Sequence, residues 1–219
     1  MAAVMMVSGT LLITDAVSTL VWQEPISALM ALRNQAELEE TFAAPPPRVV
    51  ERRPLPGDAI ARIQIPAIGV SEYVVEGTST EDLREGPGHY PETPLPGDPG
   101  TSAIAGHRTT YGAPFRRIDK LKAGQRLLLE MVRESYVYRV EKTAIVDDSD
   151  RSVLDPVGRP RLVLTACHPL YSAAQRIVVF ARLVGTRPSR VSRSDASRDS
   201  RNRISPITST REITSTTSQ

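Results

Sequence analysis

The sequence predicts an all-β fold, a closed barrel or a sandwich, for roughly residues 58–184 of this 219-residue chain. Two observations lead to this prediction. Short runs of β-branched and aromatic residues with a period of two are separated by glycine, proline and polar turns. The sequence also lacks a glycine-rich phosphate loop and the strand–helix alternation of nucleotide-binding folds. At 40% hydrophobic and 24% charged residues, the composition is that of a folded protein with one core of ordinary size.

The expected strands follow one another along this segment. In the first, AIARIQI, apolar Ile63 and Ile65 alternate with polar Arg62 and Gln64, as in a half-buried strand. Further runs have the same character: EYVVEG, GTSAIAGH, QRLLLEMV, SYVYRVEKTAIV, RLVLTAC and QRIVVFARLV. Roughly seven or eight short strands with regular turns are typical of a closed barrel or a sandwich.

Two short helical segments interrupt the strands. STEDLREG has a capping-box pattern from Ser79 to Asp82 and ends at Gly86. PFRRIDKLKAG begins with Pro114, a residue favoured at the first position of a helix, and ends at Gly124. The predicted domain is therefore a barrel or sandwich with two short helices.

Residues 1–22 are apolar or small and are interrupted only by Asp15. About 20 such residues can cross a hydrocarbon core of roughly 30 Å as a helix. A buried helix of a globular domain and a cleaved signal peptide are the alternatives, but no basic residue precedes the segment and no clear cleavage site follows it. We therefore expect an uncleaved transmembrane anchor, although a carboxylate within the span is costly unless it is paired or protonated.

Residues 23–57 are expected to connect this anchor to the domain. From Pro25 to Phe42, apolar residues recur at helical spacing among good helix formers, which predicts a juxtamembrane helix. The prolines that follow it in AAPPPRVVERRPLPGD predict a stiff, extended linker.

Residues 185–219 are rich in serine, threonine and arginine and nearly lack core-forming residues, which predicts a disordered tail. The tail has seven arginines and three acidic residues, a net charge of +4. Binding of an anionic envelope polymer is one interpretation of this charge, and a solvated tail is the simpler one. The whole chain carries a net charge of +2, which gives no reason to expect a nucleic-acid partner, and we expect none.

Cys167 is the only cysteine, so the chain has no internal disulfide. It ends an apolar strand, and nine residues later Arg176 opens the next strand, so a hairpin would bring both side chains to one face. The strand GTSAIAGH ends at His107 in the same way. Nucleophilic thiol chemistry needs such a set: a thiolate, an imidazole that protonates the leaving amine, and a cation that stabilises the oxyanion. Taken singly, each residue also has a structural interpretation, as a core cysteine or a solvated strand-end histidine or arginine.

Two stretches of the sequence resemble a known family. AIAGHRTTYGAPFRRIDKLKAGQ, followed by LVLTACHPLYSAAQRIVVFARL, is similar to the sortases, membrane-anchored cysteine transpeptidases of Gram-positive bacteria. GPGHYPETPLPGDPGTSAIAGHRTTYGAPF is most similar to class E sortases of high-GC species, and then to class D. The resemblance extends from about Asp58 to Val184. It implies a closed eight-stranded sortase β-barrel, with His107 as general acid and base, Cys167 as nucleophile and Arg176 as stabiliser of the oxyanion or the substrate.

The same resemblance implies the reaction. A sortase cleaves a C-terminal sorting signal between threonine and glycine, forms a thioester acyl-enzyme, and transfers the protein to an amine of a peptidoglycan precursor or a pilin. Class E sortases favour Leu-Ala-x-Thr-Gly over Leu-Pro-x-Thr-Gly, and Tyr111 would help form the pocket for this motif. The partners would be secreted proteins that carry such a signal, and the domain would lie outside the cytoplasm on a single-pass membrane anchor. No cofactor is implied.

The sequence departs from the family pattern beside the nucleophile. The family strand T-L-x-T-C reads VLTAC here, so Ala166 stands where the family has a threonine. His168, adjacent to the thiol, is a rival base, but successive strand residues point to opposite faces. His89, in GPGHYP, is expected in a loop near the groove. The candidate substrate-binding residues are therefore Tyr111, Thr165, Ala166, His168 and His89.

No set of histidine, cysteine and aspartate has the spacing of a transition-metal site, so we expect no metal. VDDSD, with Asp147, Asp148 and Asp150, has the clustered carboxylates that a calcium site would need, and a solvated acidic loop is the simpler interpretation. Two alternatives to a transpeptidase stay open: a catalytically silent sortase-like module that binds sorting peptides, and a hydrolase in which water resolves the acyl-enzyme. The H-G…S-x-G-C pattern of an L,D-transpeptidase is absent.

Overall fold

The computed structural model of the chain describes residues 7, 13–14, 25–43 and 54–189. Most of the predicted membrane anchor, most of the proline-rich linker and nearly all of the predicted tail therefore lie outside the described residues. None of the helices among the described residues is both long and apolar enough to cross a membrane.

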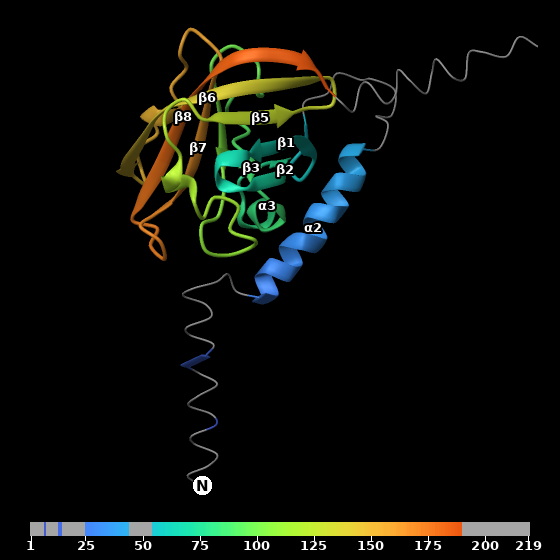
Figure 1. The fold of residues 1–219 in the computed structure, drawn as a ribbon, viewed down its shortest axis with the longest axis vertical. Helices are drawn as coiled ribbons and strands as arrows, with labels where there is room; N and C mark the ends of the chain where they lie inside the picture. The colour runs from blue at the N-terminus through green and yellow to red at the C-terminus, as the bar shows by residue number, and fades with distance from the viewer. Residues whose placement is uncertain (1–6, 8–12, 15–24, 44–53, 190–219) are drawn as a thin grey trace, which may run out of the picture.

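Eight strands form a closed barrel in the order β1-β2-β3-β4-β7-β8-β6-β5 (Figure 1). This result confirms the all-β prediction and the closed eight-stranded barrel that the resemblance implied. The pairing is antiparallel except between β2 and β3 and between β4 and β7, which are parallel. The strands are β1 (Ala59–Ile65), β2 (Val70–Glu76), β3 (Gly88–His89), β4 (Thr101–Ala105), β5 (Arg126–Glu130), β6 (Glu134–Asp147), β7 (Arg161–His168) and β8 (Gln175–Pro188).

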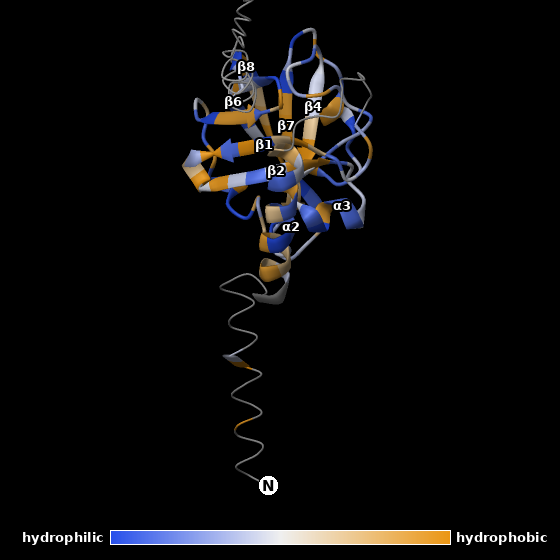
Figure 2. Ribbon diagram, turned by 90° about the vertical axis from the view of Figure 1, so that its right-hand side faces the viewer, coloured by the Kyte–Doolittle hydropathy of each residue, from blue (hydrophilic) through white to orange (hydrophobic). Residues whose placement is uncertain are grey.

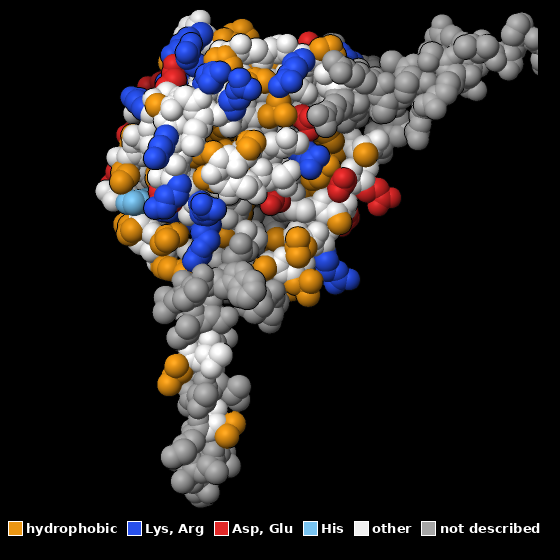
Figure 3. All heavy atoms as spheres, viewed as in Figure 1, with side chains coloured by type: hydrophobic (Ala, Val, Ile, Leu, Met, Phe, Trp, Pro, Cys, Tyr) orange, Lys and Arg blue, Asp and Glu red, His pale blue; other side chains and the backbone are white. Residues whose placement is uncertain are grey.

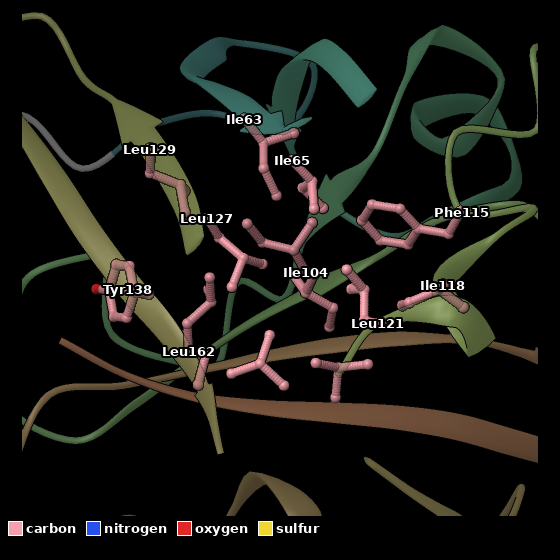
Figure 4. Close-up of a cluster of buried hydrophobic side chains, with 14 of the residues drawn as sticks. Ile63, Ile65, Ile104, Phe115, Ile118, Leu121, Leu127, Leu129, Tyr138 and Leu162 are labelled. Carbon is pink, nitrogen blue, oxygen red and sulfur yellow. The ribbon is translucent and has the colours of Figure 1, made fainter. Parts of the chain in front are cut away.

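The barrel interior is filled by apolar side chains from alternate strand positions. In β1, Ile63 and Ile65 are fully buried, while Arg62 and Gln64 point to the other face and are half-buried. Side chains from several strands meet in the interior, as Figure 4 shows for Ile63, Ile65, Ile104, Leu127, Leu129, Tyr138 and Leu162. Figure 2 shows hydrophobic residues along β7 in the same way. Because each fully buried apolar side chain contributes about 1.5–3 kcal/mol, this core is the main source of stability.

Helix α2 (Pro25–Ala43) runs along one flank of the barrel (Figure 1), and its bounds agree with the predicted helix to within one residue. Leu38 and Phe42 are buried and pack against Tyr73 and Val75 of β2. The ring centroids of Phe42 and Tyr73 lie 5.5 Å apart. Leu29, Met30 and Leu32 of this helix are exposed. Figure 3 shows apolar side chains on the surface in this region.

Helix α3 (Thr80–Glu85) has the capping box that the sequence predicts. The Asp82 N–H donates to the Ser79 hydroxyl at 3.2 Å, and the Ser79 N–H donates to the Asp82 carboxylate at 2.9 Å. Because each of these bonds satisfies a backbone or side-chain group at the helix N-terminus, a helix of six residues is stable at this position.

The second predicted helical segment, from Pro114 to Gly124, contains only one turn of 3-10 helix, at Ile118–Lys120. Phe115 and Ile118 are fully buried in the core cluster. The burial of these two side chains therefore determines the path of the backbone here. This tertiary packing overrides the helix propensity of the segment.

Strand β8 continues beyond residue 184, the predicted end of the domain, to Pro188. Its last residues pair with the start of β6, since Pro188 lies opposite Glu134 and Thr186 lies opposite Tyr136. The predicted boundary is wrong because main-chain pairing with β6, rather than apolar side chains, holds this part of the strand. Residues 185–188 therefore belong to the barrel and not to the tail.

Gly106 follows β4 and lies against the ring of Phe115. A Cβ atom at Gly106 would lie 2.5 Å from Phe115 Cδ2, and because Phe115 is fully buried its ring cannot move aside. We expect Gly106→Ala to lower the free energy of unfolding by about 1–3 kcal/mol, measured by chemical denaturation. The control is Gly158→Ala, because a Cβ atom there would meet nothing within 4 Å and the change should stay within about 0.5 kcal/mol. Equal stabilities for the two variants would contradict the prediction.

Candidate active site

Three strand ends meet at one edge of the barrel. Cys167 of β7 and Arg176 of β8 are direct partners in an antiparallel ladder, so their side chains share a face. On its other side β7 pairs in parallel with β4. The N–H of Gly106, just after β4, continues this pairing by donating to the Thr165 carbonyl at 3.0 Å. The next residue, His107, is thereby brought to the level of Cys167.

One cavity of about 290 Å³ is lined by all three predicted catalytic residues, His107, Cys167 and Arg176. Strand residues and α3 add further apolar groups, and the segment between β6 and β7 adds charged ones. These lining residues include Leu83, Tyr90, Val146, Asp148, Asp150, Arg151, Val153, Leu154, Thr165 and Val178. Apolar walls beside polar groups suit a peptide segment, which offers both apolar side chains and a polar backbone.

His107 is half-buried at this edge, and burial holds the pKa of its imidazole below the ordinary value of 6.5. The side chain is therefore neutral at pH 7 and can accept a proton. Its Nε2 atom is buried and has no hydrogen-bond partner among the described residues. A buried polar atom without a partner costs free energy, and such atoms occur where a substrate or a reaction intermediate supplies the missing bond.

Cys167 is a free, half-buried thiol that faces the cavity, whereas the neighbouring Leu164 and Ala166 are buried in the core. The interpretation of Cys167 as an ordinary core residue is therefore wrong. A thiol that is accessible from a cavity shared with an imidazole has the environment of a nucleophile.

The Arg176 guanidinium is held at the start of β8 by two main-chain carbonyls. Its Nη1 atom donates to the Ala173 carbonyl at 2.7 Å and to the Gln175 carbonyl at 3.0 Å. These bonds fix the cation at the cavity edge opposite Cys167, where it can stabilise negative charge that develops on a carbonyl oxygen.

Arg108, to which the sequence pattern assigned no role, supports the site through hydrogen bonds to two segments beside the thiol and the imidazole. Its side chain is only 4% exposed. Its Nη1 atom donates to the Cys167 carbonyl at 3.2 Å, and its Nη2 atom donates to the Arg116 carbonyl at 3.3 Å and to the Asp119 carboxylate at 3.0 Å. One guanidinium therefore connects the end of β7 to the segment that follows His107.

The charge of Arg108 is balanced by Asp119. Burial alone would raise the pKa of the Asp119 carboxyl, but the hydrogen bond from Lys120 and the charge of Arg108 hold that pKa below its usual value. The Asp119 carboxyl therefore stays ionised at neutral pH and supplies the partner that a buried guanidinium requires. The histidine–arginine pair in the motif AGHR is the sequence signal that could have identified Arg108.

Two of the predicted substrate-binding residues, Thr165 and Ala166, line the cavity. The Thr165 hydroxyl lies 3.2 Å from the hydroxyl of Tyr90, which also lines the cavity and was not among the predicted site residues. Ala166 is 4% exposed and packs in the core cluster, so its methyl group points away from the thiol.

Two other predicted substrate-binding residues lie outside this cavity. His168 does not line it; its Nδ1 atom lies 3.5 Å from Arg108 Nη1, on the far side of the strand from the thiol. Tyr111 lines a second cavity of about 370 Å³, between α2 and the barrel, while its ring centroid lies 5.3 Å from that of His107. Tyr111 therefore covers the imidazole rather than forming a wall of the catalytic cavity.

The expectation that His89 lies in a loop near the groove is wrong. It belongs to β3, is 1% exposed, and is opposite Glu76 in the parallel pair of β2 and β3. Its Nδ1 atom lies 2.7 Å from the Glu76 carboxylate, and its Nε2 atom contacts the Pro94 carbonyl at 3.1 Å. A buried side chain with partners at both ring nitrogens has a structural role and cannot reach a substrate.

The acidic loop VDDSD is organised by serine hydrogen bonds. The Ser149 hydroxyl donates to Asp147 at 2.6 Å, and the Ser152 hydroxyl donates to Asp150 at 2.6 Å. Within residues 25–43 and 54–189, no group of three histidine, cysteine, aspartate or glutamate residues is placed to hold a metal ion.

A barrel whose edge places a thiol, a neutral imidazole and a fixed guanidinium in one cavity has the groups of a cysteine acyltransferase or peptidase. Comparison with known proteins identifies the family. A family model described as a sortase domain matches residues 63–184. The chain belongs to the sortase family of cysteine transpeptidases.

Individual relatives agree with this assignment. Sortase D of Bacillus subtilis is 33% identical over 136 residues, which cover 60% of this chain and 67% of the relative. Sortase SrtE1 of Streptomyces coelicolor is 32% identical over 157 residues, which cover 64% of this chain and 45% of the relative. The structure of a Clostridium perfringens sortase D5 transpeptidase superposes with a TM-score of 0.61 at 27% identity, covering 71% of this chain and 99% of that one. The expected similarity to classes E and D is confirmed, and the chain spans less than half the length of SrtE1.

The lowered pKa of His107 should make stability depend on pH. Because the folded pKa lies below the ordinary 6.5, the unfolded chain binds a proton more readily than the folded protein. The contribution of His107 to stability is therefore fully present above pH 6.5 and is lost as the pH drops from 6.5 toward the folded pKa. We expect His107→Gln to reduce this slope, measured as the free energy of unfolding between about pH 5 and pH 8. If the free energy of unfolding has the same pH dependence in the wild type and in His107→Gln, the prediction is wrong.

Arg108→Lys keeps the positive charge but cannot reach all the acceptors of the guanidinium. We expect it to lower the free energy of unfolding by about 1–3 kcal/mol and to reduce turnover, because the Cys167 carbonyl loses its donor. The matched control is Arg117→Lys at an exposed position of the same segment, which should stay within about 0.5 kcal/mol. Chemical denaturation and peptide turnover of both variants provide the measurement. If the two variants behave alike, Arg108 does not support the site.

Proposed function

We propose that this chain is a class E-like sortase, anchored in the cell membrane by residues 1–22 with its barrel outside the cytoplasm. It would cleave a C-terminal sorting signal of the Leu-Ala-x-Thr-Gly or Leu-Pro-x-Thr-Gly type between threonine and glycine, and transfer the protein to an amine of the cell wall. The observation that carries this proposal is the presence of His107, Cys167 and Arg176 in one cavity.

In the first half of the reaction, the Cys167 sulfur attacks the threonine carbonyl while the neutral His107 imidazole takes the thiol proton. The new carbon–sulfur bond leaves negative charge on the carbonyl oxygen, which Arg176 stabilises. The tetrahedral intermediate collapses, the carbon–nitrogen bond to glycine breaks, and His107 gives its proton to the departing glycine amine. The product is a thioester between threonine and Cys167.

In the second half, an amine of a peptidoglycan precursor or a pilin attacks the thioester. His107 takes a proton from the attacking nitrogen, and Arg176 again stabilises the oxyanion. The carbon–sulfur bond breaks, the thiol regains its proton, and the protein is joined to the amine by a new amide bond. A water molecule in place of the amine would give hydrolysis. The ratio of aminolysis to hydrolysis of the acyl-enzyme therefore decides whether the enzyme is a transferase or a hydrolase.

The membrane location rests on the sequence. Residues 1–22 are apolar or small apart from Asp15 and precede α2 by two residues. A span of about 20 residues suits a bilayer, and an enzyme that acts on secreted proteins needs its cavity on the outer side. The names of the relatives, Sortase D and SrtE1, support the class but say nothing of the sorting signal that this chain reads.

The decisive experiment mixes the full-length protein with Leu-Ala-x-Thr-Gly and Leu-Pro-x-Thr-Gly peptides and a glycine-based amine, and follows the products by mass spectrometry. We expect cleavage between threonine and glycine with the amine attached to threonine. Cys167→Ala should lower the rate at least about 10³-fold. Arg176→Ala should lower it about 10²- to 10³-fold, as for the loss of an oxyanion stabiliser.

The matched control for Arg176 is Arg182→Ala. This arginine lies further along β8, outside the cavity, and contacts Glu141 at 3.8 Å. It should leave turnover unchanged. Cleavage without ligation across a panel of amines would identify a hydrolase instead. Binding of the peptides without an acyl-enzyme would identify a silent recognition module, and either result would overturn the proposal.

A further inference from the structure

A line of contacts connects α2 to the imidazole of His107. The Asn34 side chain of α2 donates to the Arg84 carbonyl at 3.3 Å. The Arg84 guanidinium carbon in turn lies 5.7 Å from the centre of the Tyr111 ring. That ring centre lies 5.3 Å from the centre of the His107 ring. Neither Arg84 nor Tyr111 lines the catalytic cavity, so Tyr111 contacts His107 from outside that cavity, and Arg84 contacts Tyr111.

Gln35 fastens α2 to this region through three hydrogen bonds. Its Nε2 atom donates to the Glu85 carbonyl at 2.9 Å and to the Tyr73 carbonyl at 3.2 Å, and its Oε1 atom accepts from the Tyr73 N–H at 2.6 Å. One side chain therefore ties the helix both to β2 and to the last residue of α3. Because Arg84 is the residue before Glu85, α2 fixes the backbone that carries the guanidinium.

The backbone around Tyr111 needs such support. Tyr111 has a φ of 49°, Gly112 of 73° and Ala113 of 43°. Residues other than glycine rarely adopt positive φ, and they keep it only where surrounding contacts impose it. α2 provides one of these contacts, since a Cβ atom at Gly112 would lie 3.1 Å from the Ala31 Cβ.

We propose that Arg84, held in place by α2, is a positioning residue for the catalytic histidine: it packs on the face of Tyr111 and keeps that ring against the His107 imidazole. The proposal rests on the proposed function insofar as His107 is the general acid and base. α2 contributes no side chain to the catalytic cavity. In this proposal, α2 instead stabilises the conformation of the segment after β4 that positions His107.

The physical effect of this packing is to keep water away from the imidazole. Burial is the cause that lowers the pKa of His107, and the Tyr111 ring covers one side of it. Loss of the Arg84 contact should let Tyr111 move and water reach His107, so its pKa should rise toward the ordinary 6.5. Besides His107, the titratable or charged side chains that line the catalytic cavity are Tyr90, Asp148, Asp150, Arg151, Cys167 and Arg176.

The first test is a nuclear magnetic resonance titration of the full-length protein labelled at histidine Cε1. The chain has three histidines, and His107→Gln assigns the signal of interest. Arg84 is exposed, so Arg84→Ala should fold normally. We expect the pKa of His107 to be higher in Arg84→Ala than in the wild type. The matched control is Lys142→Ala, which removes an exposed cation 5.0 Å from the Phe180 ring, outside the catalytic cavity, and should leave His107 unchanged.

A double-mutant cycle then separates action through Tyr111 from a direct effect of the Arg84 charge. If Arg84 acts through the ring, Arg84→Ala has no further effect in a Tyr111→Leu background. If the charge acts directly on His107, the shift persists in that background and the proposal is overturned. Tyr111→Phe keeps the ring and should retain the wild-type titration.

The second test measures turnover of the sorting peptide. We expect Arg84→Ala to lower kcat about two- to fivefold with KM unchanged, as the loss of an exposed cation–π contact allows. A change confined to KM would place Arg84 in peptide binding and would overturn a positioning role. Because the titration needs no substrate, a shifted pKa in an inactive protein would reject the proposed function alone, and normal turnover of the wild type with an unshifted pKa in Arg84→Ala would reject the positioning role alone.

Discussion

The parallel pairing of β4 with β7 is the constraint on which the site depends. β7 has β4 on one side and β8 on the other, so the ends of three strands reach the same edge of the barrel. Side chains alternate between faces, and a slip of one residue would exchange Cys167 for Ala166, which faces the core. The relative positions of the thiol, the imidazole and the guanidinium therefore follow from main-chain hydrogen bonds and core packing, both of which are fixed before any substrate arrives.

Two arginines lie near this edge in different environments, one buried and one exposed. Arg108 is buried, paired with Asp119 and bonded to the Cys167 carbonyl, so it makes strong, charge-assisted bonds that fix the end of β7. Arg84 is exposed and contacts an aromatic ring, which is a weaker interaction that solvent and salt can modulate. The backbone of Cys167 is thereby held by a buried side chain, whereas the ring that covers His107 is contacted by an exposed one.

The sequence predicted most of the barrel because the relevant signals are local. The alternation of Ile63 and Ile65 with polar neighbours and the Ser79 capping box each depend on residues a few positions apart. His89 escaped prediction because its partner Glu76 lies thirteen residues away and becomes a neighbour only when β2 and β3 pair in parallel. The role of Arg108 could not be predicted for the same reason, because its acceptors lie in β7 and in the segment that follows His107, which are far apart in the sequence. The candidate catalytic residues could be chosen because each ends or begins a recognisable strand.

The segment after His107 shows why a closed barrel is not sufficient for this site. Tyr111 and Ala113 both have positive φ, and each non-glycine residue in that region costs about 1 kcal/mol or more. Within the segment, the Phe115 N–H donates to the His107 carbonyl at 3.0 Å, and the Phe115 ring is buried in the core. On the outside, it is held by α2, whose Ala31 lies against Gly112. Without that outer contact the strained backbone could relax and shift the imidazole with it, so a helix that lies outside the barrel contributes to the position of His107 at the cavity.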